Sequence, residues 1–321
     1  MVFRMPEILV TGATGFIGKA VVQRLLAEDR WPRVIVSVRR DDRQWSERIL
    51  PHVTGDLESS TDWSVALYGV SVVIHCAARV HVMADTAANS LEEFRRVNVQ
   101  GTLNLARQAA AAGVRRFVFV SSIKVNGEET QPGCPFTADN APVPLEAYGL
   151  SKMEAEEGLR KINQQTGMEV VIIRPPLVYG QGVKANFAVM MRWLKFSLPL
   201  PLGAIHNQRS LVALDNLVDL IMHCLTHPAA ANQTFLVSDD QDISTTELLN
   251  RMGEALGCPA RLVPVPSSWL KLAATVIGKQ DMAQRLCGNL QVDIEKTRRM
   301  LDWKPLISLD EGLARVALGA K

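Results

Sequence analysis

Glu7-Ile8-Leu9-Val10-Thr11-Gly12-Ala13-Thr14-Gly15-Phe16-Ile17-Gly18 is the stretch around which the chain is organised. An apolar run ends at a glycine, two more glycines follow at intervals of three, and a helical pattern of apolar residues comes next. This order indicates the first βαβ unit of a dinucleotide-binding fold. We expect Gly12 to permit the sharp turn, Gly15 to let the backbone approach a pyrophosphate and Gly18 to allow close helix–strand packing. The unpaired N–H groups at the helix start would then hold the phosphates.

Apolar runs alternate with helical patterns through the first half of the chain. After the opening run, the apolar runs are Val34–Val38, His52–Thr54, Val72–Cys76, Phe117–Ser121 and Val170–Arg174. The pattern predicts amphipathic helices at about 61–67, 90–112 and 147–165. The alternation predicts an α/β fold with a doubly wound parallel sheet of the Rossmann type. Helices would cover both faces, and ligands would bind at the carboxyl ends of the strands.

The pattern loosens beyond residue 178. Prolines there separate short helices from short strands, and no second glycine-rich turn occurs. We therefore expect a smaller C-terminal lobe that binds the substrate. The predicted division assigns residues 1–178 and 208–238 to the dinucleotide-binding domain and residues 179–207 and 239–321 to the substrate-binding lobe.

The composition is typical of a soluble globular protein, with 321 residues of which 47% are hydrophobic and 21% charged. A formal net charge of +2 argues neither for nucleic acid nor for an anionic membrane surface as the main partner. The five cysteines are widely spread and form no Cys-x-x-Cys, which indicates reduced thiols in a cytoplasmic protein and no zinc site. Because a core strand already begins at Glu7, we expect no signal peptide.

Two segments that could suggest a membrane span or a metal site have plainer interpretations. Phe187–Ile205 contains Arg192, Lys195 and two prolines, so we expect a packed helix followed by a loop. His223 and His227 have the spacing of two metal ligands on a helix, but no third ligand is evident. We expect helix-end histidines there and no bound metal.

The end of the second apolar run bears on the choice of cofactor. In the dinucleotide-binding fingerprint, an acidic residue about 20 positions after the glycines binds the ribose 2′-hydroxyl of NAD. Here Val36-Ser37-Val38 is followed by Arg39 and Arg40, with no carboxylate at the strand end. Arginine can bind a 2′-phosphate in a bidentate manner, whereas a carboxylate would repel it. This favours NADP(H), with NAD(H) as the alternative; the plainer alternative for both arginines is that they are solvated loop charges.

Further candidate residues follow the other runs. Asp56, before Leu57, could accept a hydrogen bond from an adenine amino group or cap a helix that begins near Ser60. His75 is expected to be a hydrogen-bonded core histidine, and the small residues after it would let a cofactor lie across the sheet edge. Asn98 is a poor helix former in an apolar setting and should tie a helix to a strand.

Tyr148-Gly149-Leu150-Ser151-Lys152, with Ser122 after the preceding strand, carries the strongest chemical signal. Tyr148 and Lys152 are four residues apart and share a helix face. A neighbouring ammonium favours the phenolate and lowers the pKa of a tyrosine, which is ordinarily about 10. Tyr148 could then exchange a proton with an alcohol or carbonyl oxygen while Ser122 hydrogen-bonds the same oxygen.

Taken in order, these motifs resemble those of extended short-chain dehydrogenases/reductases of the nucleotide-sugar epimerase/dehydratase group. The matching stretches extend over nearly the whole chain: Thr11–Gly18, Gly55–Leu57, His75–Ala78, Asn98, Ser121-Ser122, Tyr148–Lys152, Arg174–Gly180, Asp293–Lys296 and Leu301–Pro305. Asn126 is a departure, because tyrosine is frequent at this position in the group. The absence of an acidic residue after the second strand is another departure.

The resemblance implies roles for individual residues. The implied catalytic residues are Ser122, Tyr148 and Lys152. The implied cofactor-binding residues are Gly12, Gly15, Phe16, Ile17, Gly18, Arg39, Arg40, Asp56, Leu57, Ala77, Ala78, Tyr148, Lys152 and Pro175. The implied substrate-binding residues are Ser122, Asn186, Arg209 and Arg285.

The resemblance extends to bacterial enzymes that make lipopolysaccharide O-antigens. Because the arginine pair favours NADPH, we expect reduction of the C4 keto group of a UDP-linked 4-keto-6-deoxy-N-acetylhexosamine, a sugar of the N-acetylquinovosamine type. A UDP-hexose or UDP-N-acetylhexosamine 4-epimerase is the alternative. An NADP-sensing regulator without catalysis and a reductase of apolar ketones are weaker alternatives. We expect a homodimer formed by the helices at about 90–112 and 147–165, whose small residues suit close packing.

Overall fold

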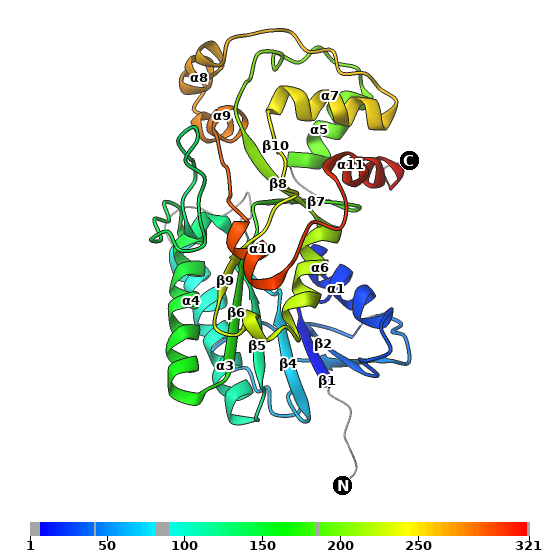
Figure 1. The fold of residues 1–321 in the computed structure, drawn as a ribbon, viewed down its shortest axis with the longest axis vertical. Coiled ribbons are helices and arrows are strands. Elements are labelled where there is room, and N and C mark those ends of the chain that lie inside the picture. The colour runs from blue at the N-terminus through cyan, green and yellow to red at the C-terminus, as the bar shows by residue number, and fades with distance from the viewer. Residues whose placement is uncertain (1–6, 42, 81–89, 184–185, 320–321) are drawn as a thin grey trace.

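The computed structural model describes residues 7–41, 43–80, 90–183 and 186–319. Its central layer is a parallel sheet with the strand order β3-β2-β1-β4-β5-β6-β9 (Figure 1). The strands of this sheet are β1 (Glu7–Thr11), β2 (Val34–Val38), β3 (Ile49–Val53), β4 (Val70–His75), β5 (Arg116–Val120), β6 (Glu169–Arg174) and β9 (Thr234–Leu236). From β1 the strands follow one another outward to β2 and β3 on one side. The chain then crosses over to form β4 on the other side of β1, followed by β5, β6 and β9. The doubly wound α/β fold is therefore confirmed.

Helices cover both faces of this sheet, and alternating strand residues supply two cores. Ile8 and Val10 of β1 belong to one apolar cluster, whereas Leu9 belongs to the other. The first cluster includes residues of α1 (Phe16–Leu26) and α6 (Leu214–Cys224), which pack together. The second includes residues of α3 (Thr102–Ala111) and α4 (Ala147–Thr166). Period-two burial on both faces is the pattern of a strand in the middle of a three-layer fold.

A smaller lobe lies beyond the carboxyl ends of the strands (Figure 1). It contains a second sheet with the order β10-β8-β7 and its own apolar cluster. The strands are β7 (Leu177–Tyr179), β8 (Arg209–Ala213) and β10 (Asp242–Ile243). The remaining helices are α5 (Asn186–Lys195), α7 (Thr245–Leu256), α8 (Ser267–Val276), α9 (Gln280–Cys287), α10 (Glu295–Leu301) and α11 (Leu309–Leu318).

The chain crosses between the two sheets several times. Within the segment 208–238, β9 is a strand of the large sheet and α6 packs beside α1 on one face of it, but β8 pairs with β7 and β10 in the small sheet. The two-domain division expected from the sequence stays a prediction. The segment Phe187–Ile205 forms most of α5 and then a loop, and none of the described helices is long and apolar enough to cross a membrane.

Two of the expected helices differ from the observed ones. Residues 61–67 form turns instead of a helix, because side chains of α3 bind their backbone: Gln108 Oε1 accepts from Trp63 N, and Asn104 and Gln108 donate to the Thr61 carbonyl. The expected helix at about 90–112 is interrupted. It consists of α2 (Ser90–Phe94), the π-helix η1 (Arg95–Gly101) and α3.

Candidate active site

The glycine-rich turn between β1 and α1 leaves room for a ligand at the start of α1. Gly12 has φ +67°, and a Cβ there would lie 2.7 Å from the Ala77 backbone nitrogen. A Cβ on Gly18 would lie 2.2 Å from the Gly12 carbonyl oxygen. These distances confirm the tasks expected of Gly12 and Gly18. Gly15, at the N-cap of α1, provides no side-chain hydrogen bond to the helix start, and no acidic residue occupies the first turn, which includes Phe16 and Ile17. The start of α1 therefore has no side-chain cap, which is the arrangement found where helix N-termini bind phosphates.

His75, at the end of β4, is fully buried. Its Nδ1 lies 2.6 Å from Thr11 Oγ1 and its Nε2 2.9 Å from Thr102 Oγ1. Burial, with a contribution from the Lys152 charge, lowers its pKa to about 3. His75 is therefore the neutral core histidine that the sequence predicts. Ala77, with Ala78 next to it, donates its N–H to Thr11 Oγ1 at 3.3 Å, which fixes the backbone beside the turn.

The residues expected around the adenosine end of a cofactor are open to solvent. Arg39 and Arg40 are exposed at the end of β2. Asp56 is exposed as well, and with residues 61–67 in turns its alternative role as a helix cap is wrong. Leu57 packs on the π-helix, where a Cβ on Gly101 would lie 2.7 Å from Leu57 Cγ. The roles of these four residues as cofactor ligands stay predictions.

Ser122 and Tyr148 come from neighbouring elements that approach closely. Ser122 is the N-cap of the short helix η2 (Ile123–Val125), and its Oγ accepts from Lys124 N at 3.3 Å. A Cβ on Gly149 would lie 2.6 Å from the Lys124 carbonyl oxygen. Only glycine allows this approach, so the residue after Tyr148 brings the start of α4 against the segment that carries Ser122.

The electrostatics of Tyr148 and Lys152 differ from the expectation. Burial raises the pKa of Tyr148 to about 12 and lowers that of Lys152 to about 8. The expected lowering of the tyrosine pKa by Lys152 is therefore wrong for this arrangement. The ammonium is turned into the sheet, where Nζ donates to the Val120 carbonyl at 2.8 Å and lies 4.4 Å from the centre of the Phe119 ring. Desolvation dominates both groups.

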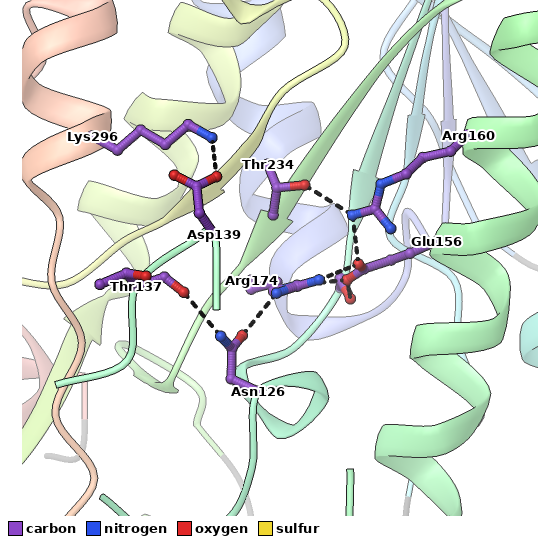
Figure 2. A network of polar contacts seen from close by, with 9 residues as sticks. Asn126, Thr137, Asp139, Glu156, Arg160, Arg174, Thr234 and Lys296 are labelled. Atoms are coloured by element: carbon purple, nitrogen blue, oxygen red, sulfur yellow. Dashed lines mark hydrogen bonds and ion pairs between the residues drawn. The ribbon is translucent and has the colours of Figure 1, made fainter. Parts of the chain in front are cut away.

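A buried ion pair behind these residues joins α4 to β6 (Figure 2). Arg174 donates to both carboxylate oxygens of Glu156, at 2.9 and 2.5 Å, and neither side chain is more than 2% exposed. Ser121 Oγ donates to Glu156 Oε1 at 2.6 Å, and Arg160 Nη2 to Oε2 at 3.1 Å. The pair is thus surrounded by the hydrogen bonds that a buried charge requires.

Asn126 completes this network, although the sequence alone suggested no role for it. Its Oδ1 accepts from Arg174 Nη1 at 2.9 Å, and its Nδ2 donates to the Thr137 carbonyl at 3.0 Å (Figure 2). Because its guanidinium is engaged by Glu156 and Asn126, Arg174 has a structural task and its side chain is not available to the nicotinamide. The adjacent Pro175 remains close to the site, because its carbonyl accepts from Ile123 N at 3.0 Å.

Asn98 ties the π-helix to two other elements. Its side chain accepts from Arg79 N at 2.8 Å and donates to the Arg79 carbonyl and to Ser151 Oγ. Asn98 thus joins η1 to the segment after β4 and to α4. This agrees with the expectation that Asn98 holds structural elements together. Glu156, which the sequence analysis missed, had a possible signal: a carboxylate four residues after Lys152, between the apolar Ala155 and Leu159.

The smaller lobe contributes two cationic side chains, Arg209 of β8 and Arg285 of α9. Arg209 Nη1 donates to the Gly288 carbonyl at 3.0 Å. Burial lowers the pKa of the Arg209 guanidinium, whereas the charges of Glu129 and Glu128 raise it. Arg285 on α9 lies 3.2 Å from Glu146, the N-cap residue of α4. Both arginines therefore lie near carboxylates.

The remaining residue expected to bind the substrate, Asn186, is only partly described. Asn186 begins α5, but its side chain lies outside the described residues.

The described residues contain no cluster that could hold a metal ion. His223 Nε2 lies 2.8 Å from the Leu301 carbonyl and its ring stacks on that of His227, with ring centres 5.1 Å apart. These are the helix-end histidines expected from the sequence. All five cysteines are free thiols.

Comparison with known proteins supplies the family. A family model described as "NAD dependent epimerase/dehydratase family" matches residues 8–238. A Vibrio cholerae protein named UDP-glucose 4-epimerase is 48% identical, over 98% of this chain and 95% of its own length. The solved structure of a UDP-glucose 4-epimerase from Thermotoga maritima with UDP-glucose is 21% identical, covers 98% of both chains and has a TM-score of 0.78. That of a dTDP-glucose 4,6-dehydratase from Streptomyces venezuelae with NAD is 25% identical, covers 98% of this chain and 96% of its own, and has a TM-score of 0.77.

These similarities overturn the expected reaction. Net reduction of a 4-keto sugar is wrong as the main prediction, because the relative with 48% identity is named as a 4-epimerase. The expectation of a reductase rested on Arg39 and Arg40 alone, and a contact to the adenosine end of a cofactor does not determine what happens at the nicotinamide. The similarities agree with the alternative, a UDP-hexose 4-epimerase.

The ion pair yields a prediction about stability. Glu156→Gln removes the charge that compensates buried Arg174, and loss of one partner of a buried pair costs about 3–5 kcal/mol. We expect the free energy of unfolding, measured by urea titration, to fall by this amount. Glu157→Gln on the same helix is the matched control, since Glu157 is exposed and should change stability by no more than about 0.5 kcal/mol. Equal stabilities of the two variants would contradict the assignment.

Proposed function

Because the chain belongs to the NAD-dependent epimerase/dehydratase family, we propose that it interconverts the C4 epimers of a UDP-hexose or UDP-N-acetylhexosamine. The observation that carries the proposal is the 48% identity to a UDP-glucose 4-epimerase over almost the full length of both chains. The approach of the Ser122 segment to the start of α4 supports it, because proton transfer at C4 needs these groups on one side of the sugar.

A bound nicotinamide dinucleotide would supply the chemistry that the side chains lack, by accepting the C4 hydride and returning it. Tyr148 would take the proton of the C4 hydroxyl and later return it, and Ser122 would hydrogen-bond the same oxygen throughout. With its pKa raised to about 12, Tyr148 needs a nearby positive charge to act as a base near neutral pH. We propose that Lys152, one helical turn away, supplies this charge once its Nζ turns from the Val120 carbonyl toward Tyr148.

The lobe would hold the nucleotide end of the substrate. We propose that Arg209 and Arg285, with Asn186, bind the diphosphate and ribose. The ion pair of Arg285 with Glu146 would then be exchanged for contacts to a phosphate, which offers charge-assisted hydrogen bonds of at least equal strength. Fixing the diphosphate orients the hexose toward the nicotinamide.

The test is an assay without added cofactor. Purified protein is incubated with UDP-glucose and, separately, with UDP-N-acetylglucosamine, and the products are followed by NMR. We expect the corresponding galacto epimers to form to equilibrium, because the hydride returns to the same carbon. Absence of epimers from both sugars, also with NAD or NADP added, would exclude the proposed reaction.

The assignment of the proton donor predicts a specific loss. Tyr148→Phe removes only the transferable proton, and general acid–base help is typically worth about 10²–10⁴-fold. We expect kcat for epimerisation to fall by this factor while the Kd for UDP, from calorimetry, stays within about twofold. Lys152→Ala should lower both kcat and cofactor affinity. A Tyr148→Phe enzyme with near-normal kcat would place the acid elsewhere.

We further propose that Arg39 and Arg40 bind a 2′-phosphate, so that NADP(H) is preferred. The support is their exposure at the two positions directly after β2, so that no carboxylate lies between the strand and Asp41. Loss of one such contact should cost about 1.5–3 kcal/mol, on the order of tenfold or more in affinity. Fluorescence titration of Arg39→Ala and Arg40→Ala should therefore show weaker NADPH binding and unchanged NADH binding. Equal affinity of the unaltered protein for both cofactors would reject this preference.

We also propose that the chain forms a homodimer through the outer sides of α3 and α4. Leu103 on α3 packs against Gly158 on α4, where an added Cβ would lie 2.5 Å from Leu103 Cδ2, so the two helices offer one continuous surface. Light scattering at working concentration should give twice the mass of the chain, 35.3 kDa. A mass of one chain would argue for ordinary packing of both helices on the sheet.

A further inference from the structure

Helix α8 lies at the outer end of the lobe (Figure 1). It carries large apolar side chains that are mostly exposed among the described residues. Trp269, Leu272 and Val276 are 71%, 68% and 80% exposed, and Ile277 just after the helix is 66% exposed. At 3.6 residues per turn Trp269, Leu272 and Val276 fall on one face, and Ile277 follows at the end of the helix. Large apolar side chains gathered on one exposed helix face mark an interaction surface.

The opposite flank of α8 shows how the helix is attached. Ala274 is buried, Leu270 packs against the apolar cluster of the lobe, and α8 packs along α9. The apolar arc of α8 is thus wider than its contact with the protein. One part holds the helix in place, and the remaining part, around Val276, faces outward.

The segment that carries this face is cationic. Residues 255–280 contain Arg261, Lys271 and Lys279 and no aspartate or glutamate, and Asp281 follows them at the start of α9. Both lysines are exposed. The formal net charge of the whole chain is only +2, so this segment is more cationic than the average suggests.

From this surface we propose that α8 is a peripheral attachment site for an anionic lipid bilayer. Trp269, Leu272, Val276 and Ile277 enter the boundary between headgroups and acyl chains, and Lys271 and Lys279 remain among the anionic headgroups. Apolar residues with a tryptophan on one face and lysines beside them are the features of helices that lie in this boundary. Attachment is peripheral, since none of the described helices could span a bilayer.

The bilayer fits this surface better than a second copy of the chain does. A stable protein interface buries about 800 Å² per partner, more than one face of a ten-residue helix offers. The cations would also meet the same cations in a symmetric pair. In a bilayer, each lysine near an anionic surface contributes favourably.

The position of α8 connects the surface to the candidate active site. The neighbouring helix α9 carries Arg285, which pairs with Glu146 at the start of α4. Attachment through α8 would therefore hold the contact between α9 and the start of α4 close to the membrane surface, without burying any residue assigned to substrate or cofactor.

The test is co-sedimentation of the full chain with vesicles of phosphatidylcholine alone and of phosphatidylcholine with phosphatidylglycerol. We expect binding to the anionic vesicles that weakens with salt. The double variant Leu272→Ser/Val276→Ser should lower the partition coefficient at least about tenfold. Lys271→Gln/Lys279→Gln should weaken binding to anionic vesicles several-fold and leave binding to neutral ones unchanged.

Val65→Ser is the matched control, because Val65 is 70% exposed, lies outside the smaller lobe and should not affect binding. Unchanged thermal transitions would show that the variants fold. The proposal is overturned if the unaltered chain does not sediment with anionic vesicles, or if the serine double variant binds them equally well. A dimer that Val276→Ser dissociates, without any vesicle binding, would assign the face to a second copy instead.

Discussion

The ion pair between Glu156 and Arg174 constrains the arrangement of the whole candidate site. Two charges removed from water lose several kcal/mol of hydration each, and only well-placed hydrogen bonds compensate for this. Here the partners come from β5, α4, β6 and the segment after η2, through Ser121, Arg160 and Asn126. Glu156 is one helical turn from Lys152, and Ser121 precedes Ser122. The side chains assigned to proton transfer therefore lie on backbone that these buried charges hold in register.

The sequence predicts well the features that depend on local chemistry. Gly12 and Gly18 have the conformations and contacts expected of them, and the apolar runs are strands of one parallel sheet. Features that depend on distant residues were not predictable. The role of Asn126 depends on Arg174, 48 positions later. The pKa of Tyr148 depends on how deeply the ring is buried, and the spacing to Lys152 does not report this.

The reaction could not be derived from the same residues. Epimerisation and net reduction at C4 use the same proton donor and the same hydroxyl stabiliser, so Ser122, Tyr148 and Lys152 are compatible with both. The two reactions differ in whether the cofactor leaves after each turnover, and these three side chains do not report this. Similarity to a 4-epimerase over nearly the whole chain is therefore stronger support for a reaction than any single motif.

The repeated crossing of the chain between its two sheets limits how such a protein can change during evolution. The chain leaves the large sheet after β6, returns for β9, and leaves again for β10, while α10 packs back beside β9 before α11 joins the lobe. No single cut in the gene separates the smaller lobe as a cassette that recombination could exchange. New specificities must therefore accumulate as point substitutions on a shared scaffold, each of which has to preserve the packing of both halves.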